Sequence, residues 1–147
     1  MDKATILKAI ESAKKSHEVQ MVKIEMAMNN EEVDTPPALD KTKCTFGIWL
    51  YNNPEIKEVI GAQFHNTIET LHTKWHLEYF KIFNIYFKDK KKKGFFSKIL
   101  SKQKIDDLEL DKAKLYYTDL KDTTKELLQK LDASYRRVDA MSDSKFD

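Results

Sequence analysis

Glycine, proline and cysteine are scarce in this 147-residue chain, which has three glycines, three prolines and a single cysteine. So few glycines and prolines leave little material for the turns of a sheet protein, whereas the many Lys, Glu, Leu and Ala residues are typical of helices. We therefore predict an all-α fold. One cysteine excludes an internal disulfide, which fits a reducing compartment and leaves metal binding or redox chemistry as special roles for the thiol.

Long apolar runs are also missing. No stretch has the apolar length of a signal peptide or of a membrane span. Basic and acidic residues nearly balance, with a formal net charge of +2, so the total charge does not indicate nucleic-acid binding. The composition predicts a soluble cytoplasmic protein whose length is that of one typical domain, long enough to fold around a core without cross-links.

Apolar residues at helical spacing predict four helices. The expected ranges are about 2–29, 40–52, 54–88 and 106–141, with a proline loop before the second. We expect an antiparallel bundle over residues 1–92 and a helical C-terminal extension over residues 93–147, which packs on the bundle or mediates dimerisation. Asp40 is the expected N-cap of the second helix, so that Cys44 falls in its first turn, where the helix dipole favours the thiolate.

Three histidines fall where they can meet the cysteine. His17 takes a position in the apolar stripe of the first helix, and His72 and His76 are one turn apart on the third, so their imidazoles can converge on one ion. His65 is two turns from His72 and too far to share that ion. With Cys44 the set has the ligand number and type of a tetrahedral zinc site, and four protein ligands favour a structural or sensing ion over a hydrolytic one.

Other residues are expected to support this site. Gly47 lies one turn after Cys44, where its missing side chain would let another helix or a ligand residue approach. Trp49 is the expected packing anchor of the second helix. Glu18 and Glu69 are candidate acceptors for the imidazole N–H groups.

The sequence Cys-Thr-Phe-Gly-Ile-Trp-Leu, residues 44–50, resembles the Cys-x-[Leu/Phe]-Gly-x-Trp core of the chemoreceptor zinc-binding (CZB) domain. The resemblance extends to a histidine on the first helix, matched by His17, and to a His-x-x-x-His pair, matched by His72 and His76. It covers about residues 1–88. It implies a bacterial cytoplasmic four-helix bundle, often a homodimer, that binds zinc through three His and one Cys. It also implies control of chemotaxis receptors or of cyclic-di-GMP synthesis by zinc itself or by oxidation of the zinc-bound Cys44. CZB domains normally accompany a signalling domain, and the sequence does not identify the partner protein that would receive the signal.

We expect no enzymatic activity. The sequence His-Thr-Lys-Trp-His, residues 72–76, lacks the glutamate of the zinc-protease motif His-Glu-x-x-His, and the chain has no glycine-rich phosphate loop and no recognisable nucleophile motif. A di-iron bundle is a rival interpretation, because Glu69-x-x-His72 matches one of its two Glu-x-x-His motifs; the second motif is missing.

The main alternative is a helical interaction module in which zinc is purely structural. The Lys88–Lys104 region combines a lysine run with Phe95 and Phe96, which suits an acidic partner or an anionic membrane surface. The simpler interpretation is a solvated connector whose phenylalanines pack on the bundle, and we favour it over peripheral membrane contact. We expect no nucleic-acid partner.

Overall fold

The computed structural model describes residues 1–87 and 105–146, and within these ranges the chain is helical with no strand. The elements are α1 (Lys3–Met28), α2 (Thr45–Asn52), α3 (Ile56–Ile60), α4 (Ala62–Tyr86), α6 (Asp107–Ala140) and a 3₁₀ helix, η2 (Asp143–Phe146). The predicted all-α fold is confirmed. The Lys88–Lys104 region, with Phe95, Phe96 and the domain boundary expected after residue 92, lies outside the described residues, so its roles stay predictions.

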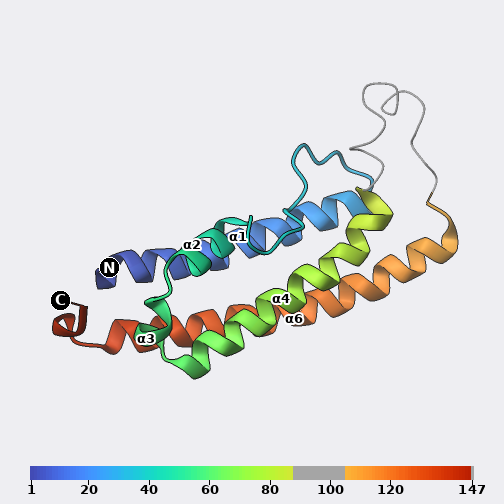
Figure 1. Cartoon of the computed structure of the whole chain (residues 1–147). Coiled ribbons are helices and arrows are strands. Elements are labelled where there is room, and N and C mark those ends of the chain that lie inside the picture. Colours follow the sequence, from blue (N-terminus) through green and yellow to red (C-terminus); the bar gives the residue numbers. More distant parts are fainter. Residues whose placement is uncertain (88–104, 147) are drawn as a thin grey trace.

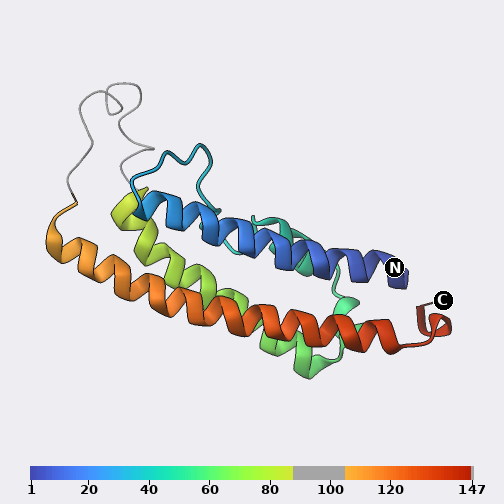
Figure 2. The ribbon, with the colours of Figure 1, turned by 180° about the vertical axis from the view of Figure 1, so that it is seen from behind.

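Three long helices form the frame of the bundle. α6 contacts both α1 and α4 along its length, and it runs opposite to them, so that the two chain ends lie at the same end of the molecule (Figures 1 and 2). Residues 29–52, which we name the connecting segment, lead from the end of α1 through a loop and α2 back along α1 (Figure 1). The predicted antiparallel helical bundle is therefore confirmed, and the expected proline loop and short second helix are both present.

Aspartate caps define the beginnings of α1 and α6, the first and last long helices. The Asp2 side chain accepts a hydrogen bond from the Thr5 N–H at 2.7 Å, and Asp106 accepts one from the Glu109 N–H at 2.8 Å. Each cap satisfies a backbone donor that a helix start leaves without a partner in the helix, which stabilises the helix.

The core consists of two apolar clusters. One contains Ile6, Ile10 and Ala13 of α1, and the other contains Ile24 and Ala27 of the same helix. His17 lies between these two stretches of α1, and His72 lies between Leu71 of the first cluster and Trp75 of the second on α4. The histidines thus occupy a polar layer between the two apolar clusters.

The expected single helix over residues 54–88 is wrong, because it is divided at Gly61 into α3 and α4. Gly61 has φ +91°, a conformation that residues with a side chain rarely adopt. The bend lets α3 bury Ile56 and Ile60, and a Cβ at Gly61 would lie 3.5 Å from the Arg137 guanidinium of α6.

Asp40 is not the N-cap of α2. Its carboxylate accepts hydrogen bonds from the Thr42 N–H at 2.8 Å and the Thr42 hydroxyl at 2.7 Å, closing a local turn of the kind that short acidic side chains favour. α2 begins at Thr45, and Cys44 is its N-cap, with the sulfur accepting from the Gly47 N–H at 3.2 Å.

Among the described residues, no helix combines the length and apolarity needed to cross a bilayer.

Candidate metal centre

His17 is buried on α1, with 2% of its surface exposed. Its Nδ1–H donates to the Ala13 carbonyl at 2.8 Å, one turn earlier on the same helix. Because a carbonyl can only accept, this bond places the proton on Nδ1 and leaves the lone pair on Nε2. The helix backbone therefore orients His17 as a potential metal ligand.

His76 is oriented in the same way by the connecting segment. Its Nδ1–H donates to the Leu39 carbonyl at 3.1 Å, which again leaves Nε2 with a lone pair. The imidazole Nε2 of His76 lies 3.1 Å from that of His72, one turn away on α4. Tyr79 lies three residues after His76, and its hydroxyl donates to the Pro37 carbonyl at 2.8 Å, which helps to hold the same loop.

The three histidines predicted as ligands lie together. One ring nitrogen of each of His17, His72 and His76 lies within 4.8 Å of the other two, and all three residues are buried. This group could hold a metal ion. His65 is not part of it.

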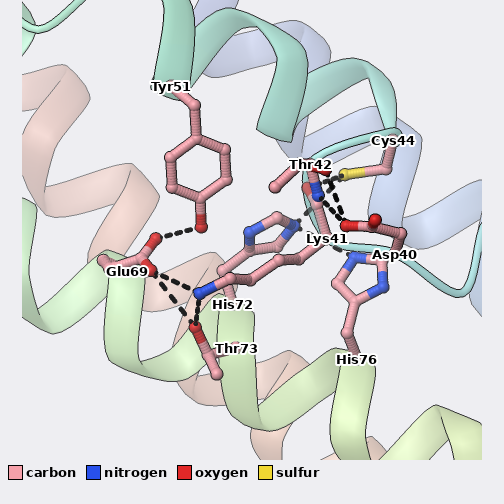
Figure 3. A network of polar contacts seen from close by, with 9 residues as sticks. All are labelled: Asp40, Lys41, Thr42, Cys44, Tyr51, Glu69, His72, Thr73 and His76. Atoms are coloured by element: carbon pink, nitrogen blue, oxygen red, sulfur yellow. Dashed lines mark hydrogen bonds and ion pairs between the residues drawn. The ribbon is translucent and has the colours of Figure 1, made fainter.

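Cys44, the fourth predicted ligand, is not part of the group whose ligand atoms all lie within 4.8 Å of one another, and its sulfur is close to one member, His72. Its Sγ lies 3.2 Å from His72 Nε2, and the close view places it on the turn above the two α4 histidines (Figure 3). In a tetrahedral zinc site, bond lengths near 2.0–2.1 Å for nitrogen and 2.3 Å for sulfur would separate two nitrogens by about 3.3 Å and a nitrogen and a sulfur by about 3.6 Å. The observed 3.1 Å and 3.2 Å separations are slightly tighter, so an ion would require only a small expansion of this pair of contacts.

His72 differs from the other two histidines. Its Nδ1 is buried without a hydrogen-bond partner among the described residues, and its ring meets the Phe46 ring edge-on at 5.0 Å. In the metal-free chain its Nε2–H donates to the lone pair of His76 Nε2 at 3.1 Å, which places the proton on Nε2. Binding of a cation at Nε2 would require this proton to leave that nitrogen, and the free Nδ1 can accept it.

Burial keeps the histidines neutral. Desolvation lowers the pKa of His17 to about 4 and that of His72 to about 2, and it lowers the pKa of His76 as well. Neighbouring imidazoles add to the lowering for His17 and His72, because two charged rings cannot share so small a space. At ordinary pH the three rings are thus in the form that binds metals.

In the protein without a cation, burial outweighs the N–H groups at the start of α2, which lower the pKa of Cys44 in the direction expected from the helix dipole. Burial raises the pKa of Cys44 above its ordinary value, and this outweighs the opposing hydrogen bonds from backbone N–H groups, the largest being that of Gly47. Cys44 is therefore a thiol, whose S–H donates to the Lys41 carbonyl at 3.4 Å. A thiolate here needs a bound cation to stabilise it.

The expected acceptors Glu18 and Glu69 do not serve the histidines. Backbone carbonyls do so for His17 and His76. Glu18 is exposed on α1, and Glu69 instead accepts from Lys41 at 2.7 Å and from the Tyr51 hydroxyl (Figure 3). The sequence gives no indication of the Lys41–Glu69 contact, because no spacing rule relates a loop residue to a helix 28 positions later.

The clearance expected at Gly47 serves mainly the backbone of its own loop, and to a smaller degree the Cys44 sulfur. A Cβ at this position would lie 1.6 Å from the Lys41 carbonyl oxygen and 3.3 Å from the Cys44 sulfur, so the glycine makes room for the backbone of its own loop. Trp49 is half-buried against the first apolar cluster and stacks on Phe46 at 6.1 Å. Phe46 in turn meets the His17 and His72 rings, so Trp49 supports the site through one intervening residue.

A cavity of about 210 Å³ gives access to the group. Its walls include His17, Cys44 and His76, and the residues around it include Lys23 and Lys43 but no acidic side chain. The cavity therefore borders two of the three histidines and Cys44 on the side of the proline loop, whereas His72 does not line it.

Comparison of the chain with models of protein families, with curated proteins and with solved structures finds no match. The resemblance to the CZB domain therefore depends on the residues themselves and stays a prediction.

Proposed function

We propose that this chain is a zinc-binding regulatory domain in which His17, Cys44, His72 and His76 together hold one Zn²⁺. The observation that carries the proposal is the convergence of three buried, neutral imidazoles within 4.8 Å, with the Cys44 sulfur 3.2 Å from one of them. Nitrogen and sulfur donors at this spacing suit zinc.

The donor set argues against a di-iron centre. Such centres rely on carboxylates, and Glu69, the carboxylate of the Glu-x-x-His match, is bonded to Lys41 and Tyr51 instead. Four protein ligands would also leave no position for a reacting water. We therefore assign the ion a regulatory role, and we expect no catalysis at it.

The four ligands divide between two parts of the molecule. The histidines belong to α1 and α4, whereas Cys44 belongs to the connecting segment. A bound ion would therefore couple the position of α2 to the presence of zinc, because a sulfur without a cation reverts to a thiol and loses its strong bond. In the context that the CZB resemblance implies, this coupling would regulate chemotaxis or cyclic-di-GMP signalling in the bacterial cytoplasm, in a homodimer.

Oxidation offers a second input at the same sulfur. A Cys44 thiolate that attacks hydrogen peroxide takes one oxygen to become a sulfenic acid while hydroxide leaves, and sulfur so oxidised is a weaker metal ligand. The cavity beside Cys44 is wide enough for such a small oxidant. Zinc and oxidant would thus act in opposite directions on α2.

Hydrogen exchange of the full chain, with and without one equivalent of zinc, tests this function. We expect zinc to slow exchange of the α2 amides by about tenfold or more, because the ion ties Cys44 to the histidines, while α6 amides change little. Addition of one equivalent of peroxide or hypochlorous acid should release zinc and restore fast exchange in α2.

Two results would count against the proposal. Equal exchange of α2 with and without zinc would mean that the ion does not hold this helix. If the oxidant left both zinc content and α2 exchange unchanged, the redox input would be wrong and zinc sensing alone would remain.

A further inference from the structure

We infer that Lys41 and Glu69 form a positioning bridge that fixes the Cys44 sulfur against the histidines. The bridge joins the loop before α2 to α4 beside His72, and the inference rests on the proposed function for the metal itself. The positioning effect acts through Cys44, while the Lys41 charge adds to burial in lowering the pKa of His72 and of His76.

The side-chain half of the bridge ends on α4. The Lys41 ammonium donates to Glu69 Oε1 at 2.7 Å and to the Thr73 hydroxyl at 2.7 Å (Figure 3). Glu69 and Thr73 are one turn apart and flank His72 in sequence. The Lys41 and Glu69 side chains are only 31% and 29% exposed, so this ion pair is held more firmly than one on the open surface.

The backbone half of the bridge ends at Cys44. In the metal-free chain the Lys41 carbonyl accepts from the Cys44 S–H at 3.4 Å. That bond is lost when the thiolate forms, but the same oxygen still fills the space that a Cβ at Gly47 would need and so keeps Lys41 packed against the first turn of α2. Lys41 is thus fixed through its side chain next to His72 and through its backbone next to Cys44. Displacement of one half would move the other.

Tyr51 extends the bridge to the end of α2. Its hydroxyl donates to the second oxygen of Glu69, and the Lys41 ammonium lies 5.5 Å from the centre of its ring, a cation–π contact. One carboxylate therefore holds both the loop before α2 and the last turn of α2. Loss of Glu69 would loosen the whole helix.

The bridge also has an electrostatic effect that must be separated from positioning. Glu69 neutralises Lys41, so its removal would leave an unpaired positive charge near a site for a cation. Charge alone would lower metal affinity without changing which atoms bind the metal. Misplacement of Cys44 would remove the metal–sulfur bond itself.

Cobalt chloride is the probe that distinguishes these effects, because Co²⁺ bound to a thiolate gives a near-ultraviolet charge-transfer absorption that histidine ligands do not give. We expect Glu69→Gln and Lys41→Met, each in the full chain, to lower this absorbance per bound cobalt by half or more and cobalt affinity about tenfold. The double variant should be no worse than either single variant, since both remove the same bridge.

Glu78→Gln is the matched control. Glu78 lies on the same helix and accepts from the Thr123 hydroxyl of α6 at 2.9 and 3.0 Å, away from the connecting segment. The Glu78→Gln variant should have the same charge-transfer absorbance per bound cobalt as wild type. Tyr51→Phe, which keeps both charges, should lower the absorbance less than Glu69→Gln does and carries the test if the charge variants do not fold.

The outcomes separate the inference from the proposed function. Wild-type protein with bound cobalt should show a charge-transfer band, and Cys44→Ser should abolish it. If wild type shows no such band, the proposed function and the bridge are both overturned. A wild-type band that Glu69→Gln leaves unchanged per bound cobalt, even at lower affinity, would overturn the bridge alone.

Discussion

The three long helices and the connecting segment are held in different ways. α1, α4 and α6 meet through fully buried apolar residues, among them Leu120 and Leu127 of α6. The connecting segment buries Phe46 and Leu50 of α2, and its loop buries Val33 and adds polar contacts to α4, such as those from Tyr79 to Pro37 and from His76 to Leu39.

This difference assigns separate tasks to the two regions. The frame fixes the three histidines through two apolar clusters, because each buried apolar side chain stabilises it by about 1.5–3 kcal/mol. The connecting segment buries fewer apolar side chains and adds hydrogen bonds with a net contribution of about 1 kcal/mol each, so it is held less firmly than the frame. The sulfur of the proposed site lies on this less firmly held region.

Gly47→Ala is expected to have the largest effect, because it should displace the connecting segment and leave the frame in place. A methyl group 1.6 Å from the Lys41 carbonyl must displace the loop, and with it Cys44, while the frame keeps its contacts. We expect zinc affinity to fall about a hundredfold, equivalent to about 3 kcal/mol, in competition titrations with a chelator. Far-ultraviolet circular dichroism should show the helical frame retained.

Ile48→Ala is the control for this variant. Ile48 is the next residue on α2, and 49% of its surface is exposed. Zinc affinity should stay within about twofold of wild type, since surface substitutions of this kind change stability little. Equal zinc affinities for Gly47→Ala and wild type would contradict the role given to the Lys41 carbonyl.

Acidification should weaken the frame of the metal-free protein by a smaller amount. The pKa of His17 is about 4 in the folded chain against 6.5 in the unfolded chain, so the unfolded chain binds more protons between these values and stability falls as pH falls through this window. Between pH 7 and pH 5 the loss from His17 alone is about 2 kcal/mol, and the lowered pKa values of His72 and His76 act in the same direction.

Urea unfolding with a chelator present, at pH 7 and pH 5, measures this loss. His17→Gln should reduce the pH dependence, because it removes one of the buried imidazoles that would have to be charged. A metal-free protein as stable at pH 5 as at pH 7 would contradict the account of a buried, neutral histidine layer.

The frame could be predicted from the sequence because its helices have regular apolar spacing. The expected ranges 2–29 and 106–141 differ from α1 and α6 by one residue at each end, and His17 is buried where the stripe places it. The spacing of His72 and His76 likewise follows from helix geometry alone. Periodicity thus accounts for the part of the site that belongs to the frame.

The connecting segment could not be predicted in this way. Its contacts depend on where a loop folds back, as in the turn at Asp40 and the fit of the Lys41 carbonyl against Gly47. The break at Gly61 depends on a backbone angle that the apolar seam does not reveal. The pKa of Cys44 follows burial more than its place at a helix start, and burial is set by the tertiary structure.

Zinc titration followed by native mass spectrometry, on wild type and on single alanine variants, tests the central claim most directly. Wild type should bind one zinc per chain. His17→Ala, Cys44→Ala, His72→Ala and His76→Ala should each lose most of that zinc, because each removes a ligand, whereas His65→Ala should retain it. A zinc stoichiometry that His17→Ala leaves unchanged would contradict a four-ligand site shared between the frame and the connecting segment.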